Sequence, residues 1–207
     1  MSIKKIYLVR HGETEQNRQG IVQGSGIDSS LNETGYNQAR LFFEKYKDFS
    51  FDKVYTSALQ RSVQSMELFI DSGVPHEKLA GLNEIHWGES EGKKFGGKND
   101  KYYRELVGKW KSGMLDYPLP GGESPSDLKF RLSKALLYIM SKNDERQVLI
   151  CMHGRAIRAL LCIMLNYPLS RMEIFEHTNF SLYQLLFSGS MFRIETYNET
   201  LKSNKRI

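Results

Sequence analysis

Two histidines in this sequence each follow a short apolar run and precede a glycine. His11 comes after the run 3–9 with Arg10 just before it, and His153 comes after the run 147–152 with Gly154 just after it. A glycine lets the backbone approach a ligand closely. A neighbouring arginine favours the neutral imidazole, the form that acts as a nucleophile. An isolated Arg-His-Gly is also typical of a histidine hydrogen-bonded in a turn, so the pattern needs support from other segments.

Such support comes from motifs spread over most of the chain, whose types and order resemble the histidine phosphatase superfamily, the phosphoglycerate mutase-like family. Residues 10–14 with Asn17 resemble its nucleophile motif, and residues 54–57 with Arg61 resemble its second-arginine motif. The other similar segments are 23–24, 31–35, 38–39, the acid-loop stretch 82–85 with Gly88 and 91–92, and the second-histidine stretch 148–154. Together these motifs are far more specific than any one of them.

The chemistry implied by the resemblance is hydrolysis of phosphate monoesters through a phosphohistidine. A monoester dianion repels nucleophiles, so catalysis needs cations around its oxygens and a nucleophile without charge. His11 is the implied nucleophile, since a free imidazole with a pKa near ~6.5 is largely neutral at pH 7. Arg10 and Arg61 are implied to bind the equatorial oxygens in a bidentate manner. His153 is implied to hydrogen-bond the transferring phosphoryl group, and no metal is needed.

The resemblance also implies a proton donor and a set of groups that bind oxygens. Glu84 stands at the position of the acid that protonates the leaving alkoxide and later takes a proton from water. Asn17, Gln23, Gly24 and Gly154 are expected to hold phosphate or substrate oxygens, with ordinary loop hydrogen bonding as the alternative for each.

Arg155 has two interpretations. It can reach a second anionic group, which would favour an acidic substrate, but the preferred interpretation is an arginine at a helix start that faces solvent or pairs with Glu173 or Glu176. Elsewhere, the histidines at 76, 86 and 177 have no metal-ligand spacing with a cysteine or an acid. We therefore predict no bound metal and no cofactor.

The elements that must position these residues alternate between strands and helices. This alternation predicts a three-layer α/β/α fold with a mainly parallel central sheet, in which ligands bind at the carboxyl ends of the strands. Both histidine motifs fall at such ends. The predicted strands are 3–9, 53–56 and 147–152, with a hairpin of 181–187 and 192–198, and the predicted helices are 34–47, a helix running to about 72–73, 125–139 and 156–165.

Local signals refine some of these elements. Ser57 with Gln60 forms a capping-box pattern, so Ser57 is predicted to cap the second helix and to place Arg61 in its first turn. Ser124, Pro125 and Asp127 predict the start of another helix. The polar, Gly-rich stretch 10–30 is predicted to hold no regular element. The stretch 81–122 is the least readable, with one helix expected at 100–111.

Composition favours a folded enzyme and excludes several other classes. The chain of 207 residues is 40% hydrophobic and 12% aromatic, which is enough for one domain over 1–207, with 202–207 expected as a frayed tail. Cys151 and Cys162 lie in apolar runs, so no disulfide framework is expected. The net charge of +5 is interspersed with acids, and no nucleic-acid module is present.

No targeting or membrane segment is recognised in the sequence. The start of the chain lacks the apolar stretch of a signal peptide. The longest apolar run, 156–165, is shorter than the roughly 20 residues that cross a bilayer. A cytoplasmic location is therefore expected.

Four functions are compatible with these motifs. A phosphatase acting on a small phosphorylated metabolite is preferred. The alternatives are a bisphosphoglycerate-dependent phosphoglycerate mutase, whose relatives are longer, an α-ribazole phosphatase, and a non-enzymatic domain that binds a phosphorylated ligand. The physiological substrate depends on the segment 81–122, and the oligomeric state is left open, with a homodimer as one option.

Overall fold

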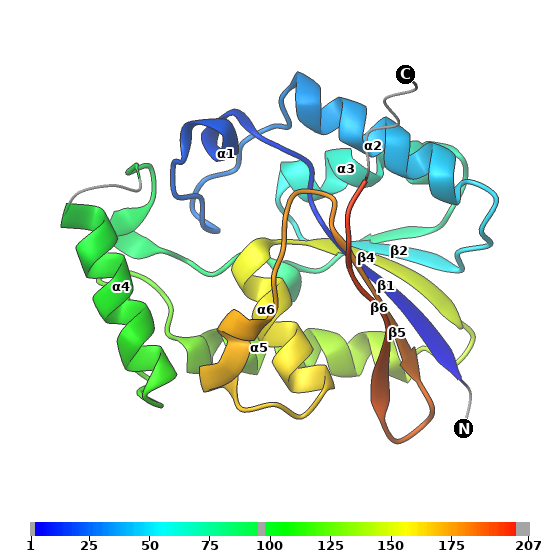
Figure 1. Cartoon of the computed structure of the whole chain (residues 1–207). Helices are drawn as coiled ribbons and strands as arrows, with labels where there is room; N and C mark the ends of the chain where they lie inside the picture. The colour runs from blue at the N-terminus through cyan, green and yellow to red at the C-terminus, as the bar shows by residue number, and fades with distance from the viewer. Residues whose placement is uncertain (1–2, 95–97, 202–207) are drawn as a thin grey trace.

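The computed structural model describes residues 3–94 and 98–201, and a twisted central sheet runs through this part of the chain (Figure 1). The sheet has six strands in the order β3-β2-β4-β1-β5-β6. The first four strands along the chain are parallel to one another, and the last two form an antiparallel hairpin at one side. Their bounds are β1 Lys4–Arg10, β2 Lys53–Thr56, β3 His76–Lys78, β4 Gln147–Met152, β5 Leu182–Phe187 and β6 Phe192–Glu199.

Helices cover both faces of the sheet, so the predicted three-layer α/β/α fold is confirmed. In Figure 1, α2 and α3 lie on one face and α5 and α6 on the other, while α4 stands apart at the end toward which β1 and β4 run. The helices are α1 Glu15–Gln19, α2 Glu33–Tyr46, α3 Gln60–Asp71, α4 Lys98–Lys111, α5 Pro125–Ser141 and α6 Gly154–Met164. Short 3₁₀ turns are η1 Ala80–Leu82, η2 Gly88–Ser90 and η3 Leu169–Ile174.

The central strands are buried on both faces, which explains why they read as continuous apolar runs. Alternate side chains of a strand point to opposite faces. On β1, Tyr7 and Val9 pack in the cluster that includes residues of α2 and α3, whereas Ile6 and Leu8 pack in the cluster that includes residues of α5 and α6. The same alternation on β4 buries the free thiol of Cys151. Packing on both faces fixes the positions of β1 and β4, and so of the residues that follow them, His11 and His153.

The main differences from the sequence prediction concern short elements. Ser57 does not cap α3, whose N-cap is Leu59 without a side-chain hydrogen bond. The stretch 10–30, predicted to be irregular, contains α1. This helix begins at a capping box in which the side chains of Thr14 and Asn17 each bond the other's backbone amide, and it ends at Gly20 with φ +67. A left-handed residue of this kind favours glycine and stops a helix after five residues.

The weakly predicted stretch 81–122 folds around α4. Leu106 and Trp110 of that helix are buried, and the indole Nε1 of Trp110 donates to the carbonyl of Tyr117 at 2.9 Å. The expected helix at 100–111 is confirmed, and so is the capping box of Ser124 and Asp127 at the start of α5. The predicted tail at 202–207 lies outside the described residues.

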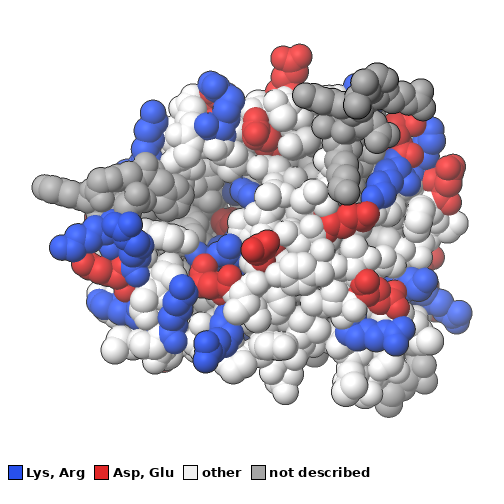
Figure 2. All heavy atoms as spheres, in the orientation of Figure 1, with Lys and Arg blue, Asp and Glu red and all other residues white. Residues whose placement is uncertain are grey.

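The surface of the described residues carries both signs of charge. Figure 2 shows basic and acidic side chains interspersed over the face that it displays, as the sequence predicts. Over the same described ranges, every helix is too short or too polar to cross a bilayer.

Candidate active site

A cavity of about 260 Å³ opens at the carboxyl ends of β1 and β4. Its size suits a small molecule rather than a polymer. The wall brings together segments far apart in the sequence, which is the arrangement expected for a ligand crevice in a parallel sheet. The lining residues are Arg10, His11, Asn17, Ile21, Val22, Gln23, Glu84, Trp87, Tyr103, Gly154, Arg155, Arg158 and His177.

The two motif histidines lie side by side because the strands before them are paired. Arg10 of β1 is in register with Met152 of β4, so the next residue of each strand leaves the sheet at the same edge. The ring centroids of His11 and His153 are 5.0 Å apart, with 53° between the ring planes. The structure therefore brings the two histidine rings together at one site.

His11 is held in a tautomer suited to attack. Its Nδ1 lies 2.7 Å from the carbonyl oxygen of Gly12, which only accepts, so Nδ1 carries the proton and Nε2 keeps the lone pair. Burial, and then the charges of Arg61 and Arg10, hold the pKa of His11 well below its usual range. The ring is therefore neutral at pH 7.

His153 is fully buried behind His11, and both of its ring nitrogens have partners. Arg61 Nε donates to His153 Nδ1 at 3.2 Å, and because a guanidinium cannot accept, Nδ1 is the unprotonated nitrogen. The Nε2–H then points to Ser57 Oγ at 2.7 Å. Burial, followed by the charges of Arg61 and Arg10, holds the pKa of His153 well below its usual range. The ring is absent from the residues that line the cavity, and the direct bond to a phosphoryl group stays a prediction.

The two arginines of the motifs occupy different positions. Arg61 is buried, and its Nη1 and Nη2 donate to the carbonyls of Ile27 at 2.7 Å and Gly24 at 3.1 Å, so it lies behind the cavity rather than forking into it. Arg10 lines the cavity. Its buried Nε has no hydrogen-bond partner within residues 3–94 and 98–201. Burial lowers the pKa of Arg10 to about 10, which leaves the guanidinium charged at pH 7.

Glu84 reaches the cavity from the loop after η1. Its Oε1 accepts from the amide of Ala156 at 2.9 Å and its Oε2 from the amide of Arg155 at 3.0 Å. Side-chain oxygens suit this position because the first amides of a helix have no partner within the helix. Arg131 of α5, which sequence reasoning missed, fixes the loop by donating to the carbonyls of Asn83 at 2.7 Å and Glu84 at 2.8 Å.

The predicted oxygen-binding residues are partly occupied by one another. Gln23 Nε2 donates to Thr14 Oγ1 at 2.6 Å, and Gln23 Oε1 accepts from Ser29. Asn17 Oδ1 accepts from Asn179 Nδ2 at 3.1 Å. These bonds fix the orientation of Asn17 and Gln23 on the wall. Seven of the ten catalytic and binding residues predicted from the sequence line the cavity: Arg10, His11, Asn17, Gln23, Glu84, Gly154 and Arg155. The other three, Gly24, Arg61 and His153, are not among the lining residues.

Comparison with known proteins identifies the arrangement. A family model described as the histidine phosphatase superfamily (branch 1) matches residues 6–200. The chain belongs to this superfamily.

Several relatives share most of their length with this histidine phosphatase. A 2,3-bisphosphoglycerate-dependent phosphoglycerate mutase of Bradyrhizobium diazoefficiens is 33% identical over 175 residues, which cover 79% of this chain and 82% of the mutase. The uncharacterized phosphatase PhoE of Bacillus subtilis is 31% identical over 194 residues, 93% of each chain. The solved alpha-ribazole phosphatase from Shigella flexneri has a TM-score of 0.81 at 22% identity and covers 94% of this chain and 96% of its own. At that identity it shows the fold alone.

His177 is a site residue of this histidine phosphatase that sequence reasoning did not find. Its Nδ1 accepts from Arg10 Nη1 at 3.2 Å, and burial followed by the charge of Arg10 lowers its pKa to about 2. A Cβ on Gly154 would lie 2.5 Å from the His177 ring, so the ring can stack on the start of α6 only because residue 154 is glycine. The Gly154 of the second-histidine motif was a signal of close packing, but not of its partner.

Arg155 follows the preferred interpretation in part. It pairs with Glu173, as predicted, but it is buried rather than facing solvent. Arg158, one turn later, pairs with the same carboxylate at 2.6 Å. Among the described residues, no group of three or more His, Cys, Asp or Glu side chains has the geometry of a metal site.

Proposed function

We propose that this protein is a metal-independent phosphomonoesterase that acts on a small phosphorylated metabolite through a phosphohistidine at His11. The observation that carries the proposal is the bond from His11 Nδ1–H to the Gly12 carbonyl, which leaves Nε2 as a neutral nucleophile on the cavity wall. Few neutral groups attack phosphorus at pH 7, and a buried imidazole beside arginines is one of them.

The first half-reaction breaks the ester bond. His11 Nε2 attacks phosphorus, the bond from phosphorus to the ester oxygen breaks, and the Glu84 carboxyl donates its proton to the departing alkoxide. In the second half-reaction the Glu84 carboxylate takes a proton from water, whose oxygen attacks phosphorus as the P–N bond breaks. Inorganic phosphate leaves, and both Glu84 and neutral His11 return to their starting states.

The positive groups play unequal parts in this proposal. Arg10 contributes its unpaired Nε and its place on the wall, so it binds a phosphoryl oxygen directly. Arg61 and His153 contribute from behind the wall, where a fixed charge is effective because water is excluded. Asn17 on the wall is placed to hold a further oxygen.

Hydrolysis is favoured over mutase activity by the extent of the match to the relatives. The match covers 93% of this chain and of the phosphatase relative, but 79% of this chain and 82% of the mutase. We carry a cytoplasmic location and a homodimer as predictions, to be checked by cell fractionation and light scattering. An α-ribazole phosphate substrate is likewise a prediction.

The test is hydrolysis of an aryl phosphate with a chelator present. We expect turnover in the wild type and a loss of at least about 10³-fold in His11→Asn. Rapid acid-free quenching is expected to trap a phosphoenzyme that is stable to alkali and labile to acid, as a phosphohistidine is. His76→Asn is the control, because His76 lies on β3 outside the cavity. Activity that disappears with the chelator, or a fully active His11→Asn, would reject the mechanism.

A further inference from the structure

Two arginines that line the cavity, Arg155 and Arg158, already pair with one carboxylate of the protein. Arg155 Nη1 and Arg158 Nη1 both bond the carboxylate of Glu173, one oxygen each. Burial alone would raise the pKa of Glu173, but Arg155 and Arg158 outweigh it and lower the pKa. The carboxylate of Glu173 therefore holds the place that a second anionic group of a substrate would take.

The remaining contacts of Arg155 also hold its guanidinium against protein groups. Its Nη2 donates to the hydroxyl of Tyr103 on α4, and its guanidinium carbon lies 5.6 Å from the ring centroids of both Trp87 and Trp110. Both terminal nitrogens of this guanidinium therefore have a protein partner, and two indoles pack beside it. A substrate carboxylate would have to compete with Glu173 and Tyr103 for these nitrogens.

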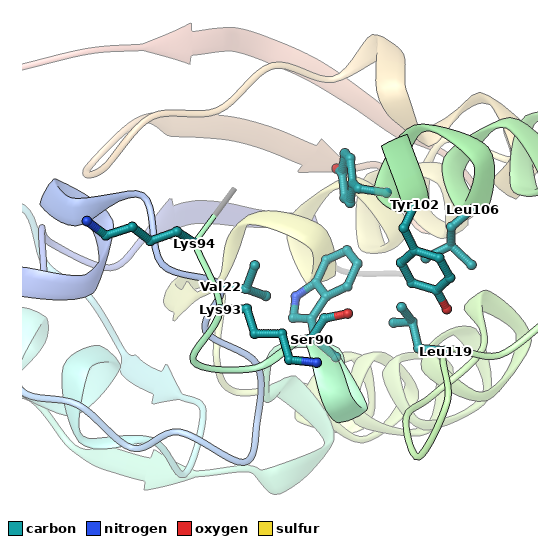
Figure 3. A pocket seen from close by; sticks show the side chains of 9 residues that line it. Val22, Ser90, Lys93, Lys94, Tyr102, Leu106 and Leu119 are labelled. Carbon is teal, nitrogen blue, oxygen red and sulfur yellow. The ribbon is translucent and has the colours of Figure 1, made fainter. Parts of the chain in front are cut away.

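The wall next to Arg155 is apolar and continues into a second, smaller pocket. Val22, Trp87 and Tyr103 line both the main cavity and this pocket of about 20 Å³, whose depth is formed by Leu106 and Leu119. Figure 3 shows Tyr102, Leu106 and Leu119 across the pocket from Val22. The free space admits a group about the size of one water or methyl.

The two lysines at the edge of this pocket do not make it an anion site. Lys93 and Lys94 are exposed residues, where charge is screened by water. In Figure 3 the Lys94 side chain extends away from Leu106 and Leu119.

We infer that the substrates are monoesters of uncharged alcohols with an apolar or aromatic part, and that Glu173 acts as the internal counter-anion that excludes phosphorylated hydroxy acids. This inference rests on the proposed function. Charge balance supports it: when Glu84 holds the proton it donates, Arg10 and Arg61 bring two positive charges, which match a phosphate dianion. Among the described residues that line the cavity, the cations besides Arg10 are Arg155 and Arg158, and both already pair with Glu173, so a further carboxylate on the alcohol would compete with it.

The experiment compares matched esters that differ only in a remote carboxylate. The pairs are phenyl phosphate with 4-carboxyphenyl phosphate, and n-propyl phosphate with 2-carboxyethyl phosphate. In the wild type we expect kcat/KM to be about tenfold higher for the ester without a carboxylate in each pair. Equal rates, or a preference for the carboxylates, would overturn the inference and leave the phosphatase proposal intact. No hydrolysis of any of the four esters would reject the phosphatase proposal itself and the inference with it.

Variants of the carboxylate then test its role. Glu173→Gln frees Arg155 and Arg158, so we expect it to move the ratio of carboxylated to neutral kcat/KM about tenfold toward the carboxylated esters. Glu173→Asp keeps the charge and is expected to keep the wild-type ratio. Glu176→Gln is the matched control, since it removes a nearby exposed charge without touching either arginine. A ratio unchanged in Glu173→Gln, or shifted equally in Glu176→Gln, would overturn the role given to Glu173. If Glu173→Gln does not fold, the wild-type ratios decide.

Discussion

The cavity has two sides that are built in different ways. The side with His11 and His153 stands on β1 and β4, two central strands buried on both faces, and its polar atoms are connected by short hydrogen bonds. The opposite side stands on loops and α4, and it is formed by aromatic packing around Arg155. The first side has the parts for phosphoryl chemistry, which any substrate of the enzyme needs. The second has the surfaces that an alcohol would touch, so the two sides separate rate from selectivity.

Glu84→Gln tests where the two sides meet, and it has the largest expected effect. The amide cannot donate a proton as an acid does, so we expect kcat/KM, which reports the first half-reaction, to fall by about 10²- to 10³-fold for phenyl phosphate. The loss of kcat/KM should be much smaller for 4-nitrophenyl phosphate, whose leaving group needs no proton. Steady-state kinetics on both esters check this, and an equal loss of kcat/KM on both would remove Glu84 from the acid role.

Ser57→Ala tests the strand side through a residue that touches no substrate. Without the hydroxyl, the Nε2–H of His153 loses its acceptor, and the ring is held by Arg61 alone. We expect kcat to fall by about tenfold, the value of one buried hydrogen bond, with little change in KM. Ser57→Thr keeps a hydroxyl and should restore most of the rate. Because a merely structural role would lower stability without this rescue, thermal unfolding of both variants is the control.

Tyr103→Phe tests the opposite wall and should act on binding. The change removes the hydroxyl that accepts from Arg155 and keeps the ring on the cavity wall. We expect KM to rise about threefold with kcat nearly constant, the pattern of lost binding that is equal in ground and transition states. The neighbouring Tyr102→Phe, which lies on the small pocket alone, should change neither. A fall in kcat with constant KM would instead show that Tyr103 acts on the chemical step, and the proposed separation of the two sides would be wrong.

His177→Asn tests stability and is expected to leave the rate nearly unchanged. The pKa of His177 is lowered to about 2, below the ~6.5 of an unfolded chain, so the unfolded state takes up a proton first as pH falls. The contribution of His177 to the unfolding free energy is therefore complete above pH 6.5 and is lost progressively as the pH drops toward 2. In His177→Asn the unfolding free energy should vary less steeply between pH 6 and 4, by up to ~1.4 kcal/mol per pH unit.

Denaturant titrations in phosphate-free buffer measure this slope. His86→Asn is the control because the side chain of His86 is 40% exposed. A slope that is unchanged in His177→Asn would mean that the ring is charged in the folded protein.

The same division explains what the sequence predicted. The strands before His11 and His153 were recognisable as apolar runs, and parallel pairing alone then brings the two rings together. The helices α2, α5 and α6 were also predicted, because their apolar residues repeat at helical spacing. The resemblance to the superfamily supplied Arg61 and Glu84, which lie on separate elements and have no local signal of their own.

The misses come from contacts made over long sequence distances. Ser57 has the composition of a helix cap, but its hydroxyl is used by His153, 96 residues away. Helix α1 is too short for a periodic pattern and depends on Thr14 and Gly20 for its bounds. The aromatic wall around Arg155 depends on how α4 packs. The direct contact with a ligand that was predicted for Arg61 and His153 stays a prediction, and both side chains are buried.

The carboxylate of Glu84 is fastened to the first amides of α6, and this gives the enzyme a built-in reporter. The amide protons of Arg155 and Ala156 point at the two oxygens whose charge changes in each half-reaction of the proposed mechanism. Their chemical shifts in a nitrogen-15 correlation spectrum therefore follow the proton on and off this acid, without any label on the substrate. The helix that begins at the second histidine motif thus makes the catalytic cycle observable from the backbone.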